Sequence, residues 1–112
     1  MSPRAAHRVT RAAVLAAALA GCAAAAPRPV RHEIQITAFV YRAPRVPVHP
    51  GDTLVFINRD AVPHTATAAG QRWDSGEIPA GESRVVVLPA NATGTYRCMY
   101  HPNMNATLAI AE

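Results

Sequence analysis

The fold is decided by a stretch in the middle of the chain, Pro50-Gly51-Asp52-Thr53-Leu54-Val55-Phe56-Ile57-Asn58. Pro-Gly-Asp is a turn signal, because these residues favour the tight backbone geometries between elements. Residues 53–58 are so apolar and β-branched that they predict a central strand. We therefore expect a β-sheet protein built around this strand.

Short strand patterns lie on both sides of this stretch. Residues 34–40 alternate, with Ile34, Ile36, Ala38 and Val40 predicted to face inward, which is the period of a strand with one buried face. Further short strands are expected at 45–49, 64–69, 83–88, 95–98 and 106–111. Pro47 confines the 45–49 strand to a sheet edge. Gly and Pro turns separate these strands, and the pattern predicts an all-β, Greek-key β-sandwich of about seven or eight strands.

The first third of the chain predicts an export signal. Arg4, Arg8 and Arg11 form a basic start, and an apolar run over residues 12–20 follows. This run is shorter than the roughly 20 residues that span a bilayer. It ends in Leu19-Ala20-Gly21-Cys22, which resembles a bacterial lipobox and implies cleavage before Cys22 and lipidation of that residue. We expect a lipoprotein signal at 1–21, lipidated Cys22 with a flexible spacer at 22–32, and one folded domain at 33–112.

The expected location follows from this signal. A lipidated Cys22 would hold the protein on a bacterial membrane, in the periplasm or cell envelope. The basic sequence pI of 9.8 does not predict nucleic-acid binding. Three of the eleven arginines belong to the signal, and the chain has no lysine, so the mature chain carries a net charge of about +1. No basic stripe for phosphates is expected.

A second informative stretch lies near the C-terminus, Cys98-Met99-Tyr100-His101-Pro102-Asn103-Met104. It places a thiol, an imidazole and a thioether at three-residue steps, and a second imidazole, His64, lies upstream. Two imidazoles and a thiolate with a weak axial thioether suit copper in both oxidation states, because nitrogen serves Cu(II) and sulfur serves Cu(I). We predict one copper ion, Cu(I)/Cu(II), held by His64, Cys98, His101 and Met104.

Two other interpretations of these residues are a structural cysteine and a zinc site. With Cys22 lipidated, Cys98 has no disulfide partner, and without its neighbours it would be an ordinary buried hydrophobic residue. Zinc also takes Cys and His ligands, but the thioether of Met104 favours copper. His32 and His49 have no sulfur neighbour and are expected at the surface.

The two blocks Gly51 to His64 and Gly94 to Met104 together resemble the cupredoxins, and within them the amicyanin and plastocyanin-like copper proteins. The resemblance covers most of the mature chain. It implies that His64, Cys98 and His101 are equatorial ligands and Met104 the axial one. It also implies that Asn58 hydrogen-bonds across to the segment that carries Cys98, and so helps to hold the site rigid.

The resemblance also implies what the protein does. We expect a monomeric, non-enzymatic electron carrier that shuttles single electrons between redox proteins through the edge of His101. The docking patch is expected at Val62, Pro63, Tyr100 and Pro102. Tyr100 stands where amicyanins have proline and Asn103 where they have an aromatic residue, and both lie where a partner is expected to dock. The alternative is a protein that binds, stores or delivers copper itself.

Overall fold

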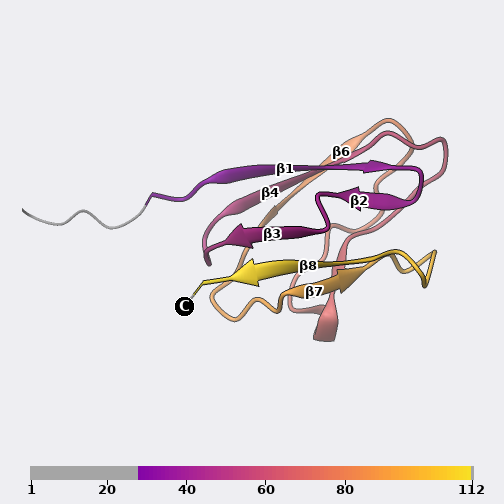
Figure 1. Cartoon of the computed structure of the whole chain (residues 1–112). Coiled ribbons are helices and arrows are strands. Elements are labelled where there is room, and N and C mark those ends of the chain that lie inside the picture. Colours follow the sequence, from indigo (N-terminus) through magenta and orange to yellow (C-terminus); the bar gives the residue numbers. More distant parts are fainter. Residues whose placement is uncertain (1–27, 112) are drawn as a thin grey trace, which may run out of the picture.

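A computed structural model describes residues 28–111 of the chain. Eight strands form two four-stranded sheets that pack against each other as a β-sandwich (Figure 1). The strands are β1 (Arg31–Thr37), β2 (Val40–Arg42), β3 (Arg45–Val48), β4 (Thr53–Asn58), β5 (Thr67–Ala68), β6 (Ser83–Val87), β7 (Thr95–Arg97) and β8 (Asn105–Ile110). The predicted all-β sandwich is confirmed.

The predicted signal and Cys22 lie outside the described residues. β1 begins at Arg31, so residues 31 and 32, which the sequence pattern assigned to the spacer, belong to the first sheet. Within residues 28–111, no helix is long and apolar enough to cross a membrane. The one helical element there is a single 3-10 turn at Ala69–Gln71.

Each sheet mixes parallel and antiparallel pairs. The first sheet has the order β2-β1-β4-β6, and β4 lies inside it, parallel to β1 and antiparallel to β6. The second sheet has the order β3-β8-β7-β5, with β3 parallel to β8 at one edge. The predictions of a central strand at 53–58 and an edge strand containing Pro47 are therefore confirmed.

The core fills the space between the two sheets. Ile34 and Ile36 from β1 are fully buried, as are Leu54 and Phe56 from β4. Aromatic rings form its centre, and Tyr96 packs against Tyr41, Phe56 and Trp73 with ring centroids 4.7 to 5.7 Å apart. Such edge-on and tilted arrangements are the favourable ones for aromatic pairs. This core fixes the ends of the strands from which the candidate site is built.

The first strand is shorter than its pattern predicted. The alternation predicted one strand through residue 40 with Ala38 and Val40 inward, but both are exposed. The chain instead turns at Ala38 and Phe39, which both have positive φ, and Val40 pairs back with Thr37. The predicted strand at 64–69 is also mostly a loop, because only Thr67 and Ala68 pair with β7. Both departures lie at the end of the sandwich where the candidate site is found.

The opposite end of the sandwich is held by the buried carboxylate of Asp52. Its Oδ1 accepts from the Val30 N–H at 2.9 Å, and its Oδ2 lies 2.8 Å from His32 Nε2 and accepts from the His49 N–H at 3.0 Å. Burial acts to raise the pKa of this carboxyl, but these hydrogen bonds outweigh it and lower the pKa from 3.8 to about 2. His32 is therefore a partner of Asp52 rather than a free surface residue.

This carboxylate predicts a loss of stability in acid. A carboxyl whose pKa is lower in the folded state stabilises the fold above its unfolded pKa, and the contribution is lost as the pH falls through the folded value. We expect wild type to lose about 2 kcal/mol of unfolding free energy between pH 4 and pH 2 through Asp52. Urea titrations of the wild type and Asp52→Asn check this, because the difference between them should shrink over that range. A constant difference would contradict it.

Candidate metal centre

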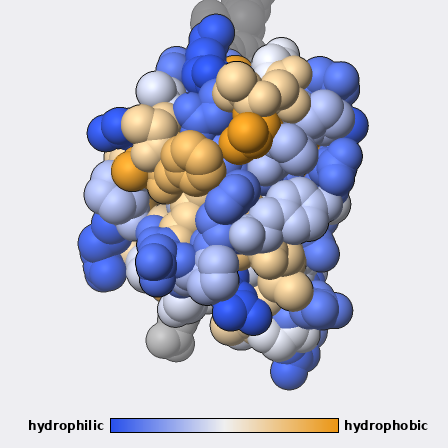
Figure 2. All heavy atoms as spheres, turned by 90° about the vertical axis from the view of Figure 1, so that its right-hand side faces the viewer, coloured by the Kyte–Doolittle hydropathy of each residue, from blue (hydrophilic) through white to orange (hydrophobic). Residues whose placement is uncertain are grey.

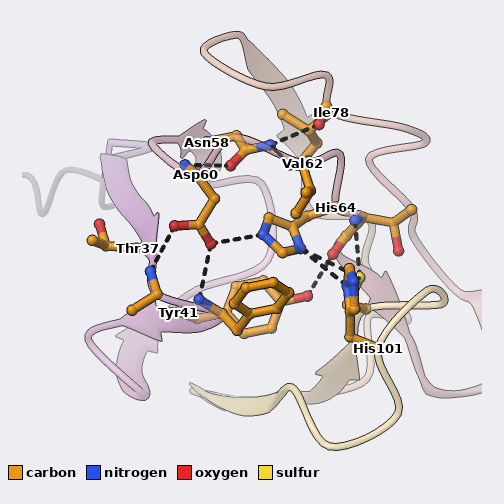
Figure 3. Close-up of polar contacts among 12 residues, drawn as sticks. Thr37, Tyr41, Asn58, Asp60, Val62, His64, Ile78 and His101 are labelled. Atoms are coloured by element: carbon orange, nitrogen blue, oxygen red, sulfur yellow. Dashed lines mark hydrogen bonds and ion pairs between the residues drawn. The ribbon is translucent and has the colours of Figure 1, made fainter.

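Three donor side chains meet at one end of the sandwich, where the loops after β4 and β7 come together. His64 lies in the loop between β4 and β5 and is held there by an antiparallel bridge with Ile78. The two backbone bonds of this bridge are 3.1 Å and 2.7 Å long. Cys98 directly follows β7, and His101 is on the short connection to β8. Figure 3 shows the rings of His64 and His101 turned toward each other.

The three donor atoms form a nearly regular triangle. His64 Nδ1 and His101 Nδ1 are 3.3 Å apart, and Cys98 Sγ is 3.8 Å from the first and 3.5 Å from the second. An ion bound in one plane at the Zn–N and Zn–S distances, about 2.0–2.1 Å and 2.3 Å, would require separations of about 3.5–3.8 Å. The residues therefore fit a single metal ion.

The buried imidazole of His64 is oriented by a carboxylate. Its Nε2 lies 2.8 Å from Asp60 Oδ2, so Nδ1 is the nitrogen that faces Cys98 and His101 (Figure 3). Burial acts to raise the pKa of the Asp60 carboxyl, but hydrogen bonds from the Phe39 N–H, His64 and the Ala38 N–H lower it below its ordinary value. An ionised carboxylate on the second nitrogen fixes the tautomer and increases the basicity of a metal-binding imidazole.

The thiol of Cys98 is enclosed by the loop that carries His64. Cys98 is 1% exposed, and its Sγ accepts from the Thr65 N–H at 3.3 Å. The Thr65 hydroxyl in turn accepts from the Met99 N–H at 2.9 Å, which joins the two loops directly. Hydrogen bonds of this kind withdraw electron density from a ligating sulfur and fix its position.

Asn58 does not make the connection that the resemblance implied. Its amide donates to the carbonyls of Val62 and Ile78, both at 2.9 Å, and its oxygen accepts from the Asp60 N–H. Among the described residues, none of its hydrogen bonds reaches the segment around Cys98. Asn58 instead holds the loop before His64 in shape. Thr65, the residue after His64, connects this loop to the segment around Cys98 through its N–H and its hydroxyl.

Met104 lies at the far end of the loop that begins at Cys98 and carries His101. It is 3% exposed and belongs to the core. Its N–H donates to the His101 carbonyl at 2.9 Å, and its carbonyl accepts from the Cys98 N–H at 3.0 Å. These two bonds hold the backbone of the residue predicted as axial ligand beside the triangle.

Two of the predicted docking residues, Tyr100 and Pro102, line a surface hollow together with His101. Val62, Pro63, Tyr100 and Pro102 are all exposed, and His101 itself is half-buried. Phe39, 47% exposed, lines the same hollow and was missed by sequence reasoning. Apolar side chains gather on this face of the molecule (Figure 2). The Tyr100 hydroxyl donates to Glu77 Oε1 at 2.7 Å and thereby ties the ligand loop to the loop before β6.

A mixed two-sheet sandwich with a Cys–His–His triangle at one end has the architecture of a cupredoxin. Solved structures to which the chain is similar include forms of amicyanin. An oxidised variant is 23% identical with a TM-score of 0.62, covering 72% of this chain and 82% of that one. A reduced variant is 25% identical with a TM-score of 0.59 over 72% and 82%. Amicyanin from Paracoccus versutus is 20% identical with a TM-score of 0.58 over 72% and 81%.

Other comparisons give no match. No protein-family model matches the chain, and no curated protein does. The chain thus has a cupredoxin fold similar to that of amicyanin, at 20% to 25% sequence identity to these structures.

Proposed function

We propose that the protein is a type 1 copper protein that carries single electrons between redox proteins outside the cytoplasm. The observation that carries this proposal is the triangle of His64 Nδ1, Cys98 Sγ and His101 Nδ1, with all separations between 3.3 and 3.8 Å. A thiolate with two imidazoles at a sandwich end is the donor set of such centres. Solved structures with a similar fold include an oxidised amicyanin variant and the reduced Cu(I) form of another.

The surrounding residues support rapid electron transfer. When bound, copper supplies a one-electron couple. His64 and Cys98 are almost completely buried and hydrogen-bonded to Asp60 and Thr65, so their donor atoms are held in fixed positions. Donor atoms held in this way suit both oxidation states without a large structural change at His64 and Cys98.

The exposed side of the site supports transient docking. Only His101 among the three donors of the triangle reaches the surface, where it shares a hollow with Phe39, Tyr100 and Pro102. An edge of its ring gives the shortest route from the site to solvent, and a small apolar patch favours weak complexes that separate quickly. The partners are therefore redox proteins that dock on this face.

Electron transfer is tested by loading the protein with one equivalent of Cu(II) and measuring reduction by small redox agents in a stopped-flow instrument. We expect fast, reversible colour loss without loss of copper. A second candidate, copper delivery, is favoured by the exposed thioether of Met99 next to Cys98. Slow electron exchange together with rapid copper transfer to a chelator would overturn electron transfer and identify delivery.

The axial position gives a prediction of its own. Met104→Leu removes a thioether donor that helps Cu(II) more than a hydrocarbon side chain does, so the reduction potential should rise while the blue colour persists. Voltammetry of wild type and variant measures this shift. An unchanged or lower potential would show that Met104 is not an axial ligand.

Membrane attachment is the second part of the proposal and depends on Cys22. Acyl chains contribute about 0.8 kcal/mol for each buried methylene, so lipidated protein should sediment with membranes. Cys22→Ala should release essentially all of it into the soluble fraction of a bacterial host. Equal partition of the two forms between the fractions would argue against lipidation.

A further inference from the structure

The turn between β1 and β2 has an unfavourable backbone conformation. Its two central residues, Ala38 and Phe39, have φ values of 53° and 62°. Two-residue turns of this kind normally use Asn and Gly, because a side chain with a Cβ is strained at positive φ. Residues held in such conformations persist only when their surroundings fix them.

Asp60 supplies that constraint, although it lies more than twenty residues away in the sequence. Its Oδ1 accepts from the Ala38 N–H at 2.6 Å, and its Oδ2 accepts from the Phe39 N–H at 2.8 Å. The same Oδ2 contacts Nε2 of the ligand His64 (Figure 3). One carboxylate therefore connects both strained residues to the metal centre.

The turn that Asp60 holds places the ring of Phe39 against the imidazoles of His64 and His101. The Phe39 centroid is 5.2 Å from that of His64 and 4.8 Å from that of His101, with interplanar angles of 85° and 88°. Edge-to-face contacts at these distances are favourable. Phe39 also remains 47% exposed, so its ring separates the two imidazoles from solvent on this side.

We propose that Asp60 and Phe39 form a clamp on the metal centre: Asp60 holds the turn in its strained conformation so that the Phe39 ring keeps His101 in place. His101 is on a short, half-exposed loop, so it is the donor that could most easily move outward. This inference rests on the proposed function, because retention of copper is its main consequence. Phe39 and Asp60 are positioning residues in this scheme, and neither is a ligand.

The first test measures copper release from the full-length chain to an excess of chelator. We expect Phe39→Ala to release copper roughly tenfold faster, which corresponds to about 1.4 kcal/mol in the barrier. Val40→Ala is the matched control, because Val40 is the next residue and is 41% exposed; it should release copper at the wild-type rate. Phe39→Tyr keeps the ring and should restore slow release. Equal rates for Phe39→Ala, Phe39→Leu and wild type would overturn the proposal.

The second test examines the role of Asp60. An asparagine side chain has only one oxygen, so Asp60→Asn cannot make all three hydrogen bonds of the carboxylate. This variant should therefore also release copper faster. Adding Ala38→Gly to this variant should partly slow release again, because glycine adopts positive φ without strain. If Asp60→Asn released copper as slowly as the wild type, Asp60 would not hold the turn.

A third test needs no metal and separates this inference from the proposed function. In the copper-free protein, NMR should show close contacts between the Phe39 ring protons and the protons of both imidazoles. Phe39→Leu should shift the His101 ring resonances by removing the ring current. Failure to bind copper would refute the proposed function and leave these NMR contacts intact, whereas their absence in a folded protein would refute the clamp.

Discussion

Replacing Cys98 by serine is expected to abolish the intense absorption band in the red that the oxidised, copper-loaded protein should have. The band arises from charge transfer between thiolate sulfur and Cu(II), and a serine hydroxyl is a hard, poorly donating replacement. The substitution changes little else, since the side chains are similar in size and the site already offers the Thr65 N–H as a donor. A spectrum before and after addition of one equivalent of Cu(II) measures the effect.

The chain contains its own control for this experiment. Cys22 is the only other cysteine in the sequence, so Cys22→Ser removes a thiol and keeps all four predicted copper ligands. This variant should keep the full band. A colourless wild-type protein, fully loaded and oxidised, would contradict the type 1 assignment.

The largest effect on stability is expected from Gly94→Ala, immediately before β7. A Cβ at Gly94 would collide with the backbone oxygen of Leu108, a residue of β8 that donates its N–H to the Gly94 carbonyl at 2.8 Å. Backbone cannot move aside as a flexible side chain can, so the two strands must separate. We expect a loss of about 3 kcal/mol of unfolding free energy, measured by urea denaturation.

Gly76→Ala serves as the comparison for Gly94. Gly76 has a φ of 71°, and no described atom lies within 4 Å of a Cβ built there. Its substitution carries only the strain of a positive φ, about 1–2 kcal/mol. Gly94→Ala should therefore be clearly the more destabilising, and equal losses would mean that β7 and β8 separate at that point without difficulty.

Much of the fold could be predicted from local patterns. Alternation located Ile34 and Ile36 on the buried face of β1, and the apolar run located β4 inside its sheet. The same alternation gave a wrong prediction for residues 38–40, because the sequence pattern continues through the turn between β1 and β2. The feature that reverses the chain there is the carboxylate of Asp60, which only the folded structure brings to that point.

The candidate site shows the same division. Cys98, His101 and Met104 are close in sequence, so their spacing alone indicated a common centre. Asp60, which orients His64, and Thr65, which donates to Cys98, come from the loop around His64, where neither spacing nor residue type predicts which hydrogen bonds form. The only sign of the Asp60–His64 contact in the sequence was that Asp60 lies four residues before His64.

The chain enters and leaves the sandwich at the same end. β1 starts and β8 finishes at the end opposite the loop that carries His101 (Figure 1). A linker joined beyond residue 111 or before residue 28 would therefore approach the molecule from behind the candidate centre. The protein could be fixed to an electrode or fused to another domain through either end, with its copper face directed outward and accessible.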